Sequence, residues 1–299
     1  MRADPNYVST LSQALNNSTN TANNLASQLS CGLRVNSLSD DPSAAAQSTK
    51  LGMEIARVDT YIQTASNQAS MLQVTDSTLG EVVTQLTAAI SLAIQGTNGT
   101  LNASNVQAVT QQLTGIRDQV LALANTSYQG RFLFAGSQGS TKPFSLDTTT
   151  TPATVTYAGD TNLQLIETPG GQRIQVSSPG TSLFGSGASG VLAALNQTIA
   201  DFTANAPSAT LAANSAALNT ALGDISTQRS LLNSSLSTLQ STSNYAQTQE
   251  AQLKVQQGSM VAADPADVAT QLKSNQTQYQ AMLSVFTALQ KVNLFDYLR

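Results

Sequence analysis

The chain has 299 residues, a formal net charge of −4 and 10% charged side chains, and it contains no histidine and one cysteine. Nucleic-acid binding needs a concentrated basic face, and a chain without histidine lacks the commonest general base and zinc ligand. The single cysteine excludes an intrachain disulfide. These properties predict no catalytic centre, no cofactor, no metal site and no nucleic-acid partner, and the lack of a long apolar run predicts no membrane partner.

Both ends of the chain carry apolar residues at alternating steps of three and four. Such a stripe along a helix is stable only when another helix covers it. The stripes therefore predict that the two termini pair with each other or are offered to neighbouring copies. Ser18 interrupts the first stripe and Asn275 the second. The N-terminal stripe consists of Val8, Leu11, Leu15, Ala22, Leu25 and Leu29, and the C-terminal stripe of Val268, Leu272, Tyr279, Met282, Phe286 and Leu289.

The next predicted helix starts after Asp41, an N-cap residue followed by Pro42 at the first helical position. The same spacing of apolar residues continues to residue 93, with Asp76 as a polar interruption. One helix over residues 42–95 would be about 80 Å long at 1.5 Å per residue. We therefore expect either a coiled-coil-like helix or a break near Asp76. Residues 96–99 then predict a tight turn.

Further along the chain, residues 106–123 repeat the helical spacing. Short alternating runs around glycine and proline turns, between residues 154 and 176, predict a small β-meander. A short helix over 191–199 follows, and then a long helix over 218–253 in which Arg229, Ser243 and Glu250 are polar interruptions. Asp264 and Pro265 repeat the helix-start signal before the last helix.

These elements predict a mainly α fold with a small β insertion. Long antiparallel coiled-coil-like helices from both termini would form nested layers, with a β domain outermost. We expect a terminal coiled-coil domain from residues 1–40 and 258–299 as the inner layer. A helical bundle from 41–136 and 188–257 would surround it, and residues 137–187 would form the β-rich outer domain.

Three motifs stand out at the ends of these helices. Each alone is typical of an ordinary structure: a capped loop, a helix C-terminus with a C-cap glycine before a buried aromatic strand, and a docked chain end. Together they resemble the hook–filament junction proteins of the flagellin superfamily. The motifs are Leu29-Ser30-Cys31-Gly32-Leu33-Arg34-Val35-Asn36 with Asp40-Asp41-Pro42; Gly115-Ile116-Arg117-Asp118-Gln119 with Leu123-Ala124-Asn125 and Gly130-Arg131-Phe132-Leu133-Phe134-Ala135-Gly136; and Asn293-Leu294-Phe295-Asp296-Tyr297-Leu298-Arg299.

The resemblance implies a structural part of the bacterial flagellum that is secreted by the flagellar type III apparatus and is helped by an export chaperone. It also implies that copies of this chain assemble helically with one another, and that this assembly joins hook-associated protein 1 to flagellin. Filament flagellin is the closest alternative, but it usually has Asp-Asp-Ala-Ala-Gly where this chain has residues 40–44, and it typically ends near Leu-Leu-Arg. A secreted coiled-coil adhesin is an alternative of another class.

The first motif usually has serine where this chain has Cys31, which we interpret as a small buried apolar residue. In a single copy we expect the uncovered terminal stripes to be largely disordered, because short isolated helices are marginal in water. We predict no catalytic residues. The predicted assembly interface comprises Val8, Leu11, Leu15, Leu25, Leu29, Arg34, Asn36, Val268, Leu272, Tyr279, Met282, Phe286 and Leu289.

Overall fold

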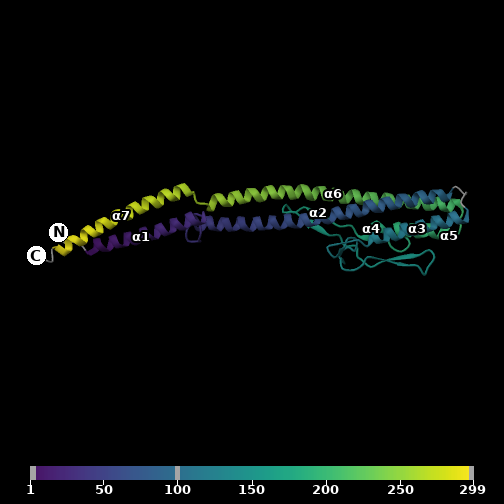
Figure 1. The fold of residues 1–299 in the computed structure, drawn as a ribbon, viewed down its shortest axis with the longest axis horizontal. Coiled ribbons are helices and arrows are strands. Elements are labelled where there is room, and N and C mark those ends of the chain that lie inside the picture. The colour runs from purple at the N-terminus through teal and green to yellow at the C-terminus, as the bar shows by residue number, and fades with distance from the viewer. Residues whose placement is uncertain (1–4, 98–101, 296–299) are drawn as a thin grey trace. The chain divides into compact units, whose positions relative to one another are not determined.

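The computed structural model describes the backbone of residues 5–97 and 102–295, and the side chains of residues 8–97 and 102–288. Helices α2 and α6 are the longest elements, and the strands are short (Figure 1). The predicted turn at 96–99 and the chain end at 296–299 lie partly or wholly outside these residues. The helices are α1 (Pro5–Cys31), α2 (Pro42–Thr97), α3 (Ala103–Ala124), α4 (Gly180–Phe184), α5 (Val191–Thr203), α6 (Ser208–Val261) and α7 (Pro265–Phe295).

The chain divides into two compact units. The terminal unit comprises Met1–Arg57 and Gln249–Arg299, and the central unit comprises Val58–Thr248. The mainly α fold class with a small β part is confirmed, and α2 and α6 contribute to both units. The finer division into three domains stays a prediction.

The helix-start signals form the caps that the sequence predicts. Asp41 Oδ1 accepts a hydrogen bond of 3.0 Å from the backbone N–H of Ala44, and α2 begins at Pro42. Asp264 Oδ1 accepts one of 2.9 Å from the N–H of Ala266 at the start of α7. Each carboxylate satisfies an N–H group that has no partner within its own helix.

Helix α2 runs through Asp76 without a break, so the coiled-coil-like alternative is the one that the structure shows. In the central unit its apolar face is buried at Val58, Leu72 and Leu79. Among the described residues, α2 is the one helix that is long and apolar enough to cross a membrane, a test that the core helix of a soluble protein also passes. The absence of a membrane partner stays a prediction.

The strands form three separate antiparallel pairs rather than the predicted meander. They are β1 (Ser127–Tyr128) with β2 (Arg131–Phe132), β3 (Phe144–Asp147) with β4 (Thr154–Tyr157), and β5 (Leu165–Glu167) with β6 (Arg173–Gln175). The predicted meander is wrong because β4 pairs with β3 and β5 pairs with β6, and the segment between β4 and β5 is bound to residues 135–137 instead. Asp160 N–H donates to Ala135 O at 3.2 Å, and the Asp160 carboxylate accepts from the N–H of Ser137 at 2.8 Å.

The β part has an aromatic core. The rings of Phe134 and Phe184 lie 5.1 Å apart edge to face, and those of Phe144 and Phe184 lie 5.5 Å apart in the same manner. All three side chains are fully buried. Gly130 of the second motif does not cap a helix, as the motif alone would suggest. Gly130 (φ 77°) lies with Gln129 (φ 50°) in the two-residue turn between β1 and β2, where positive φ angles suit a hairpin.

Candidate assembly interface

Helices α1 and α7 of the terminal unit pack side by side and run in opposite directions (Figure 1). The two terminal stripes therefore cover each other within one chain. The expectation of uncovered stripes in a single copy is corrected here, because each helix supplies the apolar partner that the other lacks alone. Leu25 and Val268 are the most deeply buried predicted interface residues, at 7% and 5% exposure.

The remaining stripe residues are covered less completely. Leu29 is exposed at 44%, and the side chain of Leu289 lies outside the described residues. A two-helix pair hides one side of each stripe and leaves the flanks accessible. The half-buried members are Val8, Leu11, Leu15, Ala22, Leu272, Tyr279, Met282 and Phe286.

The two polar interruptions of the stripes meet each other. Ser18 Oγ donates a hydrogen bond of 3.1 Å to Asn275 Oδ1, and Ser18 is 7% exposed. A hollow of about 300 Å³ lies beside them and is lined also by Ala22 and Tyr279. Among the described side chains of the two stripes, Ser18 and Asn275 thus place a polar contact between apolar neighbours.

The segments that connect α1 to α2 and α6 to α7 also pair. Leu33 and Ala262 form an antiparallel bridge, flanked by hydrogen bonds from Arg34 N–H to Val261 O at 2.7 Å and from Ala263 N–H to Gly32 O at 2.9 Å. Gly32 ends α1 with a positive φ of 71°, a conformation that suits glycine at a helix C-terminus. These contacts fix the ends of α1 and α7 to each other.

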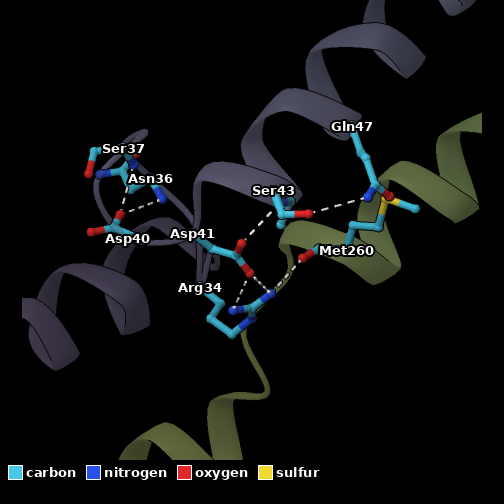
Figure 2. A network of polar contacts seen from close by, with 9 residues as sticks. Arg34, Asn36, Ser37, Asp40, Asp41, Ser43, Gln47 and Met260 are labelled. Atoms are coloured by element: carbon cyan, nitrogen blue, oxygen red, sulfur yellow. Dashed lines mark hydrogen bonds and ion pairs between the residues drawn. The ribbon is translucent and has the colours of Figure 1, made fainter.

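Arg34 links the segment between α1 and α2 to the end of α6 (Figure 2). Its two terminal nitrogens each lie 3.4 Å from Asp41 Oδ2, and one of them donates to the carbonyl of Met260 at 3.0 Å. The N–H of Ala44 and the Arg34 guanidinium both lower the pKa of the Asp41 carboxyl below its ordinary value. Asp41 thus caps α2 and binds Arg34 at the same time.

The neighbouring Asp40 closes the loop between α1 and α2. Its Oδ2 accepts hydrogen bonds from the backbone N–H groups of Ser37 at 2.8 Å and Asn36 at 3.0 Å (Figure 2). These N–H groups lower the pKa of the Asp40 carboxyl. The side chains of Arg34 and Asn36 are both exposed, so the loop presents polar groups outward while its backbone is held in place.

Two features of this region could not be read from the sequence. Cys31 is exposed, which corrects the interpretation as a buried apolar residue, because it lies outside the apolar stripe at the end of α1. The carbonyl acceptor of Met260 is a backbone group, which the sequence does not mark, and only the pairing of the two connecting segments brings it to Arg34.

Within the described residues no group of three or more metal-ligating side chains occurs, and the absence of a cofactor stays a prediction.

Comparison with known proteins identifies the class of this chain. The model of the bacterial flagellin N-terminal helical region matches residues 6–139, and that of the C-terminal helical region matches residues 216–298. Together these two regions make up most of the chain, which therefore belongs to the flagellin family of structural flagellar proteins.

Within this family the chain is similar along most of its length to flagellar hook-associated protein 3. It is 27% identical to that protein from Escherichia coli over 287 residues, which cover 90% of each chain. Flagellin A of Vibrio anguillarum is 31% identical, but over 44% of this chain and 35% of its own. A solved structure described as a putative flagellar hook-associated protein from Vibrio parahaemolyticus shares the fold, with a TM-score of 0.66 and 20% identity over 75% of this chain and all of that one.

Proposed function

We propose that this protein is a non-enzymatic structural component that joins the flagellar hook to the filament. The observation that carries the proposal is the extent of the similarity. Hook-associated protein 3 matches 90% of the chain, whereas filament flagellin A matches less than half of it. A protein that shared the terminal helices alone would match flagellin and hook-associated protein 3 over the same part.

The half-buried stripes of the terminal unit supply a mechanism for self-assembly. Full burial of a large apolar side chain contributes roughly 1.5–3 kcal/mol. Residues such as Leu15 and Phe286 are half-buried in one chain, so neighbouring copies could add about 1 kcal/mol at each of them. A ring or helix of copies repeats this gain at every subunit. The terminal unit is therefore the proposed axial contact, with Arg34 positioning the connection between α1 and α2.

The proposed partners follow from the place of a junction protein. Hook-associated protein 1 would lie on the hook side and flagellin on the filament side, and an export chaperone would bind the chain before secretion. We further propose that the three-part division of the chain corresponds to nested layers in the assembled structure, with residues 137–187 facing solvent. Residues 137–187 carry none of the stripe residues, which supports this assignment.

Deletion of the gene in the bacterium that encodes the chain tests the proposal. We expect intact hooks without filaments, together with unpolymerised flagellin in the medium, and restoration of filaments by the wild-type gene. Negative-stain electron microscopy and an immunoblot of the medium are the measurements. Missing filaments without flagellin in the medium would instead indicate filament flagellin, and normal filaments would indicate a protein outside the axial structure, such as an adhesin.

A further inference from the structure

The seam between α1 and α7 contains a polar pair where an apolar pair would be more stabilising. Ser18 is 7% exposed and its hydroxyl donates to Asn275 Oδ1 at 3.1 Å. The hollow of about 300 Å³ beside the pair shows that larger side chains would have room. Lack of space therefore does not explain the choice of serine and asparagine. Asn275 is half-buried, so the pair is partly covered. A polar pair within an apolar heptad seam lowers stability but can specify register.

The heptad spacing shows what such a pair can distinguish. With Ser18 opposite Asn275 in an antiparallel pair, the residues seven positions away also face each other: Leu11 with Met282, and Leu25 with Val268. A stagger of one heptad keeps this pattern apolar almost everywhere. It places Ser18 opposite Met282 and Asn275 opposite Leu25, so that the hydroxyl and the amide lose their partners. The stagger also exchanges apolar partners, but apart from these two mismatches each stripe residue still faces an apolar side chain, so the largest expected penalty is the loss of the polar pair.

Within one chain the connecting segments already fix the register, since Leu33 pairs with Ala262 at the end of the same two helices. Helix α1 of one copy and α7 of another have no such connection. If α1 of one copy pairs with α7 of another, the hydrogen bond between Ser18 and Asn275 forms only in the register seen within one chain. The stripes themselves repeat and accept several staggers.

We propose that Ser18 and Asn275 are specificity-determining residues that select the in-register pairing of α1 with α7 against staggered pairing between copies of this chain. This inference goes beyond the proposed function and does not depend on it. It explains why two polar residues occupy heptad positions at which apolar residues would pack more stably.

Disulfide trapping between separate chains tests the proposal in purified full-length protein with Cys31→Ser. One chain carries Leu15→Cys and the second carries either Tyr279→Cys, which reports the in-register pairing, or Phe286→Cys, which reports a stagger of one heptad. Each pair of proteins is mixed at high concentration and oxidised, and cross-linked heterodimers are quantified by mass. The ratio of staggered to in-register product is compared with and without Ser18→Leu and Asn275→Leu in both chains.

We expect the ratio to rise by about tenfold or more in the leucine variant, because the staggered form then leaves no buried polar group unpaired. The leucine variant should also melt at the same or a higher temperature, which shows that it folds. A matched control carries Asn16→Leu and Gln278→Leu on the exposed sides of the same helices. An unchanged ratio, an equal rise in the control, or no staggered product in the leucine variant overturns the proposal. Motility does not enter this measurement, so its outcome is independent of the hook–filament assignment.

Discussion

Arg229 of α6 and Asp76 of α2 form a two-pronged ion pair. Arg229 Nε lies 2.6 Å from Asp76 Oδ1, and a terminal guanidinium nitrogen lies 3.1 Å from Oδ2. Asn233 adds a hydrogen bond of 2.9 Å to the same carboxylate. The hydrogen bond from Arg229 lowers the pKa of Asp76, and the carboxylate in turn raises the pKa of Arg229. Each residue interrupts an apolar heptad pattern, so the two helices place their polar interruptions against each other.

Asp76→Ala should therefore destabilise the central unit. The side chains of Arg229 and Asp76 are 36% and 25% exposed, so solvent screens the ion pair. The expected decrease in the free energy of unfolding is therefore about 1–2 kcal/mol. Denaturant unfolding followed by circular dichroism measures it. Glu167→Ala serves as the control, since its contact with Arg173 is 4.0 Å long and exposed on both sides. Equal losses in the two variants would contradict the interpretation.

The stability of the β part should depend on acid through Asp160. The side-chain and backbone donors of Ser137, followed by those of Asn162, lower the pKa of this carboxyl in the folded protein. A group with a lowered folded pKa contributes stability that is present above its unfolded value of about 3.9 and is lost as pH falls through the folded pKa. Asp160→Asn should thus lower the unfolding midpoint at pH 7 and change it much less below pH 3.

Ser137→Ala provides the matched test of this cause. Removal of the hydroxyl donor should raise the pKa of Asp160 and shift the acid-induced loss of stability to higher pH. In the Asp160→Asn background the same serine substitution should have a much smaller effect. If Ser137→Ala costs as much without the carboxylate as with it, the hydrogen bond is not the source of the pH dependence.

Asn125 should be the most sensitive polar residue of the second motif. Its amide donates to Leu121 O and Phe144 O, each at 3.0 Å, and its oxygen accepts from Phe144 N–H at 2.9 Å. It thereby joins the end of α3 to β3. Asn125→Leu would leave two backbone groups of Phe144 without these partners, at a cost of about 2–3 kcal/mol. Thermal unfolding measures this cost. Asn219→Leu, on an exposed face of α6, should change stability by less than about 0.5 kcal/mol.

The sequence predicted the long helices well because apolar spacing reports which face of a helix is covered. It also predicted the caps at Asp41 and Asp264, since a capping carboxylate followed by proline acts locally. The spacing says nothing about which partner covers that face. Asp76 and Arg229 are 153 positions apart, and their pairing required the fold. The pairing of the short strands also required the fold. The alternation of side chains does not show that Asp160, after β4, binds the backbone of Ala135 and Ser137.

The last prediction concerns Phe286, a half-buried member of the C-terminal stripe. Phe286→Asp removes an apolar side chain from the flank that neighbouring copies are proposed to cover, and it would place an unpaired carboxylate in that seam. The central unit contains no part of α7, so its melting should stay unchanged. Because every copy repeats the defect, we expect secreted protein, no stable junction and loss of motility. Thr287→Asp, at the next and exposed position, is the control and should leave motility intact. Immunoblots of the medium, electron microscopy and swimming assays measure these outcomes, and wild-type motility in the Phe286→Asp strain would show that this stripe is not an axial contact.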